Sequence, residues 1–290
     1  MLTSEQLKAV RRIQIRTRHL VTDLFAGQYH TAFKGQGMEF AEVRPYLPGD
    51  EVRTIDWNVT ARMGVPFVKQ FVEERDLTVF LIVDVSGSLS FGSRSILKRE
   101  LAAEVAALLS FAALRNQDRI GAALVSDHLE LFLPPRRRRS HVLRLVREIL
   151  VRTSEGVTDL DRAVAATLRS LKQRAVLFLI SDFVATPYST AFKRAASRHD
   201  LVVVDVSDPR DSELPSTSPV LLRDAETREL GIVHGRSLAA DFARDRERER
   251  QEIESLARRV GGDFIHLRTD RPYLPELVKF FEARRRRLQR

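Results

Sequence analysis

Three largely apolar segments stand out in the pattern of the chain. They begin at Leu77 (LTVFLIVDV), at Ala175 and at Leu201, and they do not alternate between apolar and polar positions. Unbroken apolar runs rich in β-branched residues are typical of strands that helices cover on both faces of a parallel sheet. We therefore expect these three segments to be buried strands.

Segments with a helical apolar period separate these runs. We expect helices at 95–116, 141–152, 159–173, 237–260 and 272–288, and further strands within 119–133 and at 263–267. Strands that alternate with helices are connected by crossovers and form a layered α/β structure. The predicted fold class is therefore α/β, with a doubly wound, mostly parallel sheet and a hairpin insertion at about 211–236.

The beginning of the chain has a different pattern. Residues 4–25 carry apolar positions at helical spacing, whereas 30–75 hold short apolar segments between turn signals such as Pro48-Gly49-Asp50. We expect residues 1–75 to form an N-terminal helix and a small β-rich extension, and residues 76–290 to form the main domain. Trp57 is the only tryptophan, and we expect it to pack the extension onto the core.

Composition narrows the function. The 290 residues are 43% hydrophobic and 30% charged, which is an ordinary globular balance. The absence of cysteine excludes a disulfide scaffold, a thiolate zinc site, an iron–sulfur cluster and a cysteine nucleophile. No apolar run reaches the length of a membrane helix, and the first residues show no signal-peptide core. We expect a cytoplasmic protein.

The net charge of +9 comes mainly from two arginine runs, at 136–139 and in the tail 281–290. Such runs leave nucleic-acid binding open as an alternative function. Neither run is interleaved with the aromatic residues that single-strand binding platforms use. We therefore favour the interpretation that the first run is a solvated surface and that the second is a frayed terminus.

Oxygen-bearing side chains follow the predicted strands. They are Asp84, Ser86 and Ser88 after the first strand, Asp182 after the second, and Thr158 before a helix. Because the carboxyl ends of parallel strands meet at one sheet edge, we expect these side chains to converge. Ser86 and Thr158 taken singly also fit helix N-caps. The set together predicts a site for Mg²⁺, with Mn²⁺ or Ca²⁺ possible, that keeps an open position for a carboxylate of a protein partner.

This motif resembles the metal-ion-dependent adhesion site of von Willebrand factor A-type domains, over about 77–288. The resemblance implies that Ser86, Ser88 and Thr158 ligate the metal directly, with Asp84 and Asp182 in or near the inner coordination sphere. Two positions depart from the pattern: Phe183 stands where many such domains have glycine, and Leu89 where the family often has methionine. Neither residue is a proposed ligand.

Residues 27–76, which include KGQGMEFAEVRPYLPGDEVRTIDWNVTARMG, resemble the bacterial family called domain of unknown function 58. That family is similar to an A-type domain with an N-terminal extension. Its genes commonly neighbour those of MoxR-type AAA+ ATPases. The resemblance implies a metal-dependent protein-binding module that serves as accessory to such an ATPase in protein remodelling or in cofactor or metal insertion.

Catalysis is the alternative. A phosphatase that used Asp84 as nucleophile would need a general acid at the position of Ser86, and a serine cannot serve. The chain has neither a Gly-x-Ser-x-Gly elbow nor a Gly-x-x-x-x-Gly-Lys phosphate loop, and no histidine falls beside the Asp84 and Asp182 strand ends. We expect a protein that is not an enzyme, while a Mg²⁺-dependent hydrolase stays open.

Overall fold

The chain divides into two units in the computed structural model. The model describes residues 4–21, 23–33, 37–74, 77–94, 96–152, 154, 158–184, 188–213, 219–223, 230–233 and 235–288. The main unit comprises Met1–Phe33 and Thr78–Arg290, and the second unit comprises Lys34–Leu77. The first 33 residues therefore belong with the main unit, which differs from the predicted 1–75 extension.

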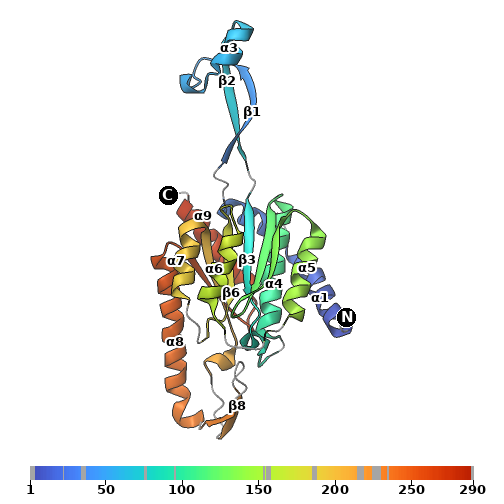
Figure 1. The fold of residues 1–290 in the computed structure, drawn as a ribbon, viewed down its shortest axis with the longest axis vertical. Helices are drawn as coiled ribbons and strands as arrows, with labels where there is room; N and C mark the ends of the chain where they lie inside the picture. Colours follow the sequence, from blue (N-terminus) through green and yellow to red (C-terminus); the bar gives the residue numbers. More distant parts are fainter. Residues whose placement is uncertain are drawn as a thin grey trace. The chain divides into compact units, whose positions relative to one another are not determined.

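The main unit is built on a six-stranded sheet (Figure 1). Its spatial order is β10 (Asp263–Arg268), β7 (Asp200–Ser207), β6 (Val176–Ser181), β3 (Thr78–Asp84), β4 (Arg119–Val125) and β5 (Leu129–Arg136). Neighbouring strands pair in parallel except β4 and β5, which form an antiparallel hairpin at one edge. The predicted doubly wound, mostly parallel α/β fold is confirmed.

The central strands are apolar because both faces of the sheet are covered. Every residue of β3 and of β6 is buried, and a strand buried on both sides has no position for a polar residue facing water. The edge strand β5 is only partly buried along most of its length. This difference explains why β3, β6 and β7 are the segments that the sequence pattern predicts most clearly.

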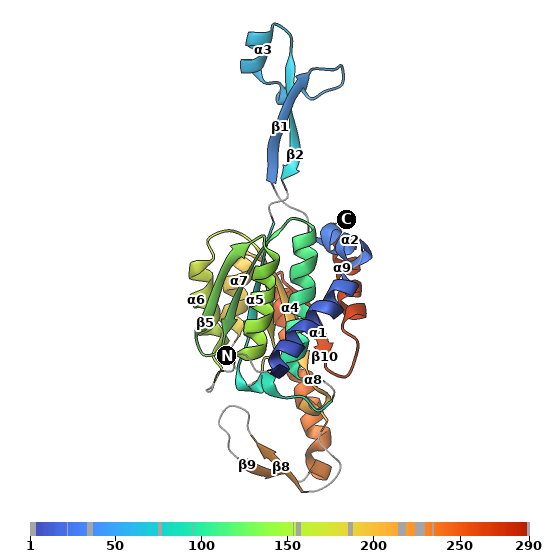
Figure 2. The ribbon, with the colours of Figure 1, turned by 90° about the vertical axis from the view of Figure 1, so that its right-hand side faces the viewer.

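Helices form a layer on each face of the sheet (Figures 1 and 2). One layer contains α6 (Leu160–Ser170), α7 (Ser189–Arg198) and α8 (Gly235–Arg259). The other contains α1 (Ser4–Leu20), α2 (Asp23–Ala32), α4 (Lys98–Arg115), α5 (Arg139–Val151) and α9 (Leu274–Leu288). Apolar side chains of each layer meet the sheet and form the core.

Aromatic packing attaches the N-terminal helices to the main unit. Phe25 and Phe33 of the N-terminal segment contact the Phe281 ring with centroids 5.4 and 5.8 Å apart, and the buried Tyr29 hydroxyl donates to Asp118 at 3.0 Å. The predicted single helix 4–25 is two helices, α1 and α2. These buried aromatic contacts place the segment in the main core rather than in an extension.

The second unit is an antiparallel hairpin with a short helical tip. Strands β1 (Gly37–Pro45) and β2 (Phe67–Glu74) pair with a register shift between Phe40 and Glu42. The tip contains the 3₁₀ turn η1 (Val52–Thr54) and α3 (Trp57–Met63), which the sequence pattern did not predict. Trp57 is 66% exposed, and the expectation that it packs the extension onto the core stays a prediction.

A small hairpin in the main unit agrees with the predicted insertion. Strands β8 (Val220–Arg223) and β9 (Leu230–Val233) pair antiparallel, and Leu221 lies opposite Ile232. Leu221, Leu230 and Ile232 are all exposed. Among the described residues, no helix combines the length and the apolar character needed to cross a bilayer.

Candidate functional site at the carboxyl edge of the sheet

Asp84 ends β3 at the edge where the parallel strands finish. Its side chain is 1% exposed. The Ser86 backbone amide donates to Asp84 Oδ1 at 2.8 Å, and the Ser181 hydroxyl of β6 donates to Asp84 Oδ2 at 2.6 Å. Burial raises the pKa of Asp84 to about 6, and the nearby Asp182 carboxylate adds to the rise. The carboxyl group is thus fixed in position, but burial and the neighbouring carboxylate disfavour its negative charge.

Ser86 and Ser88 begin the short turn η2 (Gly87–Ser90) directly after this strand. Ser86 is the N-cap residue of the turn, yet its side chain makes no capping hydrogen bond. Its hydroxyl instead lies 3.0 Å from the Ser88 hydroxyl, and both residues are buried. The N-cap explanation for the Ser86 side chain therefore does not hold, and the two hydroxyls are hydrogen-bonded to each other.

Asp182 follows β6 and contacts an internal cation. Lys98 Nζ lies 2.7 Å from Asp182 Oδ2 and 3.2 Å from Asp211 Oδ1, and the Lys98 side chain is 2% exposed. Burial by itself lowers the pKa of Lys98, but the two carboxylates outweigh it and raise that pKa. The ammonium group therefore neutralises part of the negative charge at this edge of the sheet. Lys98 cannot be recognised as a site residue from the sequence, because lysine is almost always a surface residue.

Phe183, next to Asp182, has an unusual backbone conformation. Its φ is +51°, which lies in the left-handed region that residues with a side chain rarely occupy. Glycine adopts this conformation without strain, because it has no Cβ atom. The Phe183 ring is buried and contacts Tyr188 and Phe192 with centroids 5.8 and 5.6 Å apart. Packing of the ring offsets a backbone strain of about 1–3 kcal/mol.

Thr158 is buried close to the same edge. The next residue, Asp159, donates its backbone amide to Ser126 O at 3.3 Å, just beyond the end of β4. Asp159 is the N-cap of α6, and its side chain accepts from the Arg162 amide at 2.9 Å. Capping is therefore performed by Asp159 and not by Thr158. Residues 155–157 lie outside the described part of the chain.

The donor set fits a hard divalent cation in part. Two oxygens at adjacent corners of an octahedral Mg²⁺ shell, with bonds of about 2.1 Å, lie about 3 Å apart. The Ser86 and Ser88 hydroxyls have that spacing. Asp84 lies beside them through the Ser86 amide, whereas one Asp182 oxygen is held by Lys98. In the predicted site Ser86, Ser88 and Thr158 would bind directly, and Asp84 and Asp182 would act through water.

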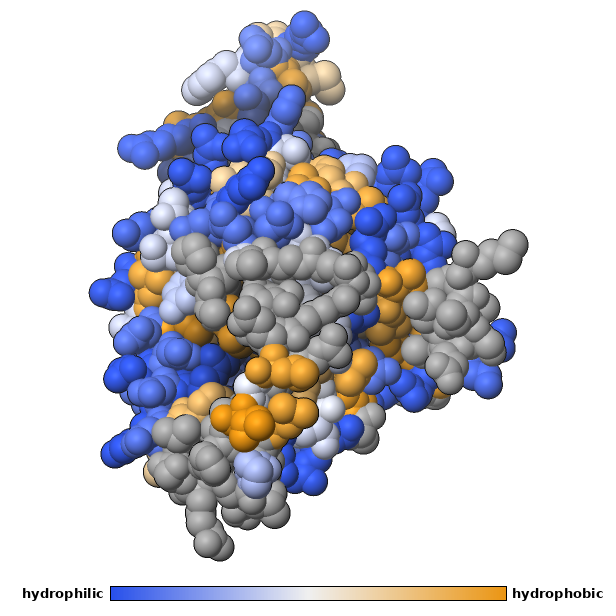
Figure 3. All heavy atoms as spheres, turned by 60° about the horizontal axis from the view of Figure 1, so that its bottom comes forward, coloured by the Kyte–Doolittle hydropathy of each residue, from blue (hydrophilic) through white to orange (hydrophobic). Residues whose placement is uncertain are grey.

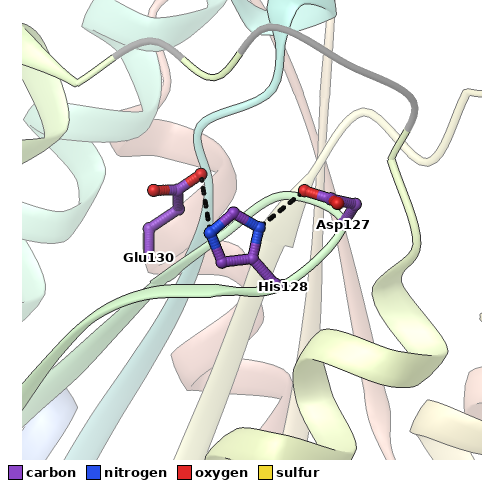
Figure 4. A group of neighbouring side chains, drawn as sticks. All are labelled: Asp127, His128 and Glu130. Carbon is purple, nitrogen blue, oxygen red and sulfur yellow. Dashed lines mark hydrogen bonds and ion pairs between the residues drawn. The ribbon is translucent and has the colours of Figure 1, made fainter.

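A second group of possible metal ligands lies at the turn between β4 and β5. Asp127, His128 and Glu130 each offer a ligand atom within 4.8 Å of the others. His128 Nδ1 lies 2.7 Å from Asp127 Oδ1, and His128 Nε2 lies 3.6 Å from Glu130 Oε1 (Figure 4). A protonated imidazole accounts for the carboxylates on both sides of the ring. Asp127, His128 and Glu130 therefore form a cluster of ion pairs, which we call the ion-pair clamp.

We expect this clamp to alter the titration of His128. The hydrogen bond that His128 donates to Asp127 raises the pKa of His128 above 6.5, and the charges of both carboxylates add to the rise. An NMR titration should find His128 above the ordinary value, and Asp127→Asn should lower its pKa. His199 serves as the internal control, because burial lowers the His199 pKa. A His128 that titrates at or below 6.5 in the unmodified protein would contradict the prediction.

Part of the arginine-rich tail is structural. Arg284 forms ion pairs with Asp200 and Asp263 and stacks over the Phe33 ring, and Arg287 pairs with Asp263. These contacts attach α9 to the sheet edge and to α2. Arg284 is largely buried and is not available to a nucleic acid, so the tail offers less free charge than its sequence indicates.

Comparison with known proteins identifies the family. The family model described as protein of unknown function DUF58 matches residues 42–252. An uncharacterized protein of Mycobacterium tuberculosis is 35% identical over 286 residues, which cover 96% of this chain and 89% of that protein. An uncharacterized protein of Mycobacterium bovis matches to the same extent. The chain belongs to the DUF58 family.

Solved structures of low sequence identity also match. An aerotolerance-related membrane protein from Bacteroides fragilis has a TM-score of 0.47 at 14% identity, and the match covers 73% of this chain and 99% of that chain. The SpRpn10 VWA domain has a TM-score of 0.40 at 10% identity, with coverage of 70% and 94%.

Proposed function

We propose that the carboxyl edge of the main sheet binds a divalent cation and, through it, an acidic side chain of a protein partner. The observation that carries the proposal is the pair of buried serine hydroxyls 3.0 Å apart beside Asp84, neither of them used as a helix cap. A bound cation would supply an electrophilic position for a carboxylate.

Three features of the chain support binding at this edge. Ser181 and the Ser86 amide hold Asp84 rigidly, which is the preorganisation that a binding site needs. Lys98 pairs with Asp182, so the chain itself compensates part of the negative charge at this edge. Figure 3, which brings the bottom of Figure 1 forward, shows apolar patches among hydrophilic residues. Protein interfaces typically have an apolar core surrounded by a polar rim.

The family resemblance suggests that the partner is a MoxR-type AAA+ ATPase or a client that the pair remodels or loads with a cofactor or metal. The ATPase would hydrolyse the nucleotide, because this chain has no phosphate-binding loop. Such a complex would work in the cytoplasm, where ATP is available. The metal site assigned here holds the partner and performs no bond cleavage.

The proposal is tested with the double variant Ser86→Ala/Ser88→Ala. This change removes both hydroxyl ligands and leaves the Lys98–Asp182 ion pair intact. We expect Mg²⁺ to raise the melting temperature of the unmodified protein, and EDTA to release a purified MoxR-type ATPase of the same organism from it. Both effects should disappear in the double variant.

The matched control is Ser110→Ala on α4. Ser110 is buried, and its hydroxyl has no hydrogen-bond partner among the described residues. This variant should bind the ATPase as the unmodified protein does. Equal recovery of the ATPase with the double variant and with the control, with or without EDTA, would overturn the proposal.

A further inference from the structure

A serine, a histidine and an aspartate converge at the end of β7. Asp205 lies on β7 directly opposite His266 on β10. His266 Nδ1 lies 2.7 Å from Asp205 Oδ2, and His266 Nε2 lies 3.5 Å from the Ser207 hydroxyl oxygen. Asp205 and Ser207 are two positions apart on one strand, so their side chains point to the same face of the sheet. The imidazole ring bridges them.

Each member has the environment that its role in nucleophilic catalysis requires. Asp205 is 5% exposed, and its buried carboxylate fixes the ring and the tautomer of His266. Ser207 is half-buried, so a small molecule has access to its hydroxyl. A serine–histidine separation slightly longer than an ideal hydrogen bond is common in such sites before substrate binds. The Ser207 hydroxyl also lies 3.5 Å from Leu267 O.

The group lines a small cavity of about 100 Å³, together with Arg246 and Arg250 of α8 and with carboxylates that include Asp182 and Asp211. Such a volume corresponds to about three water molecules and suits a short acyl group. Each arginine pairs with a neighbouring glutamate, and a guanidinium has five donors, so N–H groups remain for an oxyanion. The cavity also opens at the carboxyl ends of the strands, where ligands of α/β sheets bind.

We infer that Ser207, His266 and Asp205 form a nucleophilic site that hydrolyses small carboxylic esters. The Ser207 oxygen attacks the carbonyl carbon while its proton passes to His266 Nε2. The carbon–oxygen bond to the alcohol breaks, and the alcohol leaves with that proton. Water, deprotonated by His266, then attacks the acyl group on Ser207, and a carboxylic acid leaves as the hydroxyl is restored. None of these steps uses a metal ion.

The experiment uses the full chain, a fluorophosphonate probe and p-nitrophenyl acetate. We expect one phosphonyl group to be added to the unmodified protein, at Ser207 by peptide mapping, and EDTA to have no effect. Ester hydrolysis should begin with a burst of about one p-nitrophenolate per chain. Ser207→Ala should abolish the adduct and the burst, and Asp205→Asn should slow labelling by about 100-fold or more.

Ser212→Ala is the matched control, because Ser212 lines the same cavity and is not part of the Ser207–His266–Asp205 group. It should be labelled at Ser207 as fast as the unmodified protein. The inference fails if the folded, unmodified protein acquires no adduct on Ser207. It also fails if Asp205→Asn is labelled there at the unmodified rate, since His266 and Asp205 would then be a purely structural pair between β7 and β10.

Discussion

Replacement of Lys98 by methionine is expected to lower the free energy of unfolding by about 3–5 kcal/mol. Methionine keeps much of the aliphatic volume but removes the ammonium group, which lies 2.7 Å from Asp182 and 3.2 Å from Asp211. The side chains of Lys98 and Asp182 are only 2% and 3% exposed, so water cannot replace the lost partner. The measurement is urea denaturation of the metal-free protein in EDTA near pH 7.

Two further variants show whether the loss comes from the uncompensated charge. Lys193→Met removes an exposed lysine of α7 and should change stability by no more than about 0.5 kcal/mol. Lys98→Met/Asp182→Asn removes the unpaired carboxylate together with the ammonium and should recover part of the loss. A Lys98→Met protein as stable as the unmodified chain would show that the Asp182 carboxylate finds another partner.

Lys98 also changes the expected strength of metal binding. A cation gains affinity from the negative charge around it, and here one Asp182 oxygen already belongs to an ammonium group. The edge therefore presents less free charge than two unpaired carboxylates would. This arrangement favours a cation whose binding is completed by the carboxylate of a partner, which agrees with a reversible docking role.

The sequence predicts the fold well where buried segments can be recognised from an unbroken run of apolar residues. Strands β3, β6 and β7 are covered on both faces, and their composition shows it directly. The apolar pattern of helix α7 is weak, because two of its three buried residues are alanines. No proline marks the break between α1 and α2 in the sequence. The packing of Tyr29 and Phe33 into the core depends on residues more than 80 positions away.

The candidate site shows the same limit. Asp84, Ser86 and Ser88 are close in sequence on one strand end and are therefore recognisable as a motif. Lys98 reaches the site from the start of α4, and its ion pair with Asp182 spans 84 positions. His266 meets Asp205 across 61 positions through the parallel register of β10 and β7. Only the folded sheet determines such pairings.

Asp84→Asn is expected to stabilise the metal-free protein near pH 8 by about 2–3 kcal/mol. The folded protein raises the pKa of Asp84 from 3.8 to about 6, chiefly through burial and then through Asp182. A carboxyl group whose pKa is higher in the folded state favours folding while it is protonated. That contribution is present below pH 3.8, falls as the pH rises, and is lost above about pH 6. At 1.36 kcal/mol per pKa unit, the rise corresponds to about 3 kcal/mol.

The amide of asparagine avoids this loss because it carries no charge at any pH. Its oxygen still accepts from the Ser86 amide, and the Ser181 hydroxyl is able to turn and accept from the new N–H₂ group. Urea denaturation in EDTA should therefore show equal stability of the two proteins near pH 4 and a growing advantage of Asp84→Asn toward pH 8. Asp245→Asn, an exposed change on α8, should follow the unmodified protein at every pH.

The same substitution should cost the protein its response to Mg²⁺. Without Asp84, the site lacks the negative charge beside Ser86 and Ser88 that would balance a divalent cation. Mg²⁺ should therefore stabilise the unmodified protein but not Asp84→Asn. The Asp84 carboxylate would then weaken the metal-free fold but be required for cation binding. Such a trade-off between stability and function is expected at a binding site. If Asp84→Asn proves less stable than the unmodified protein in EDTA at pH 8, Asp84 instead serves the fold as an ionised hydrogen-bond acceptor.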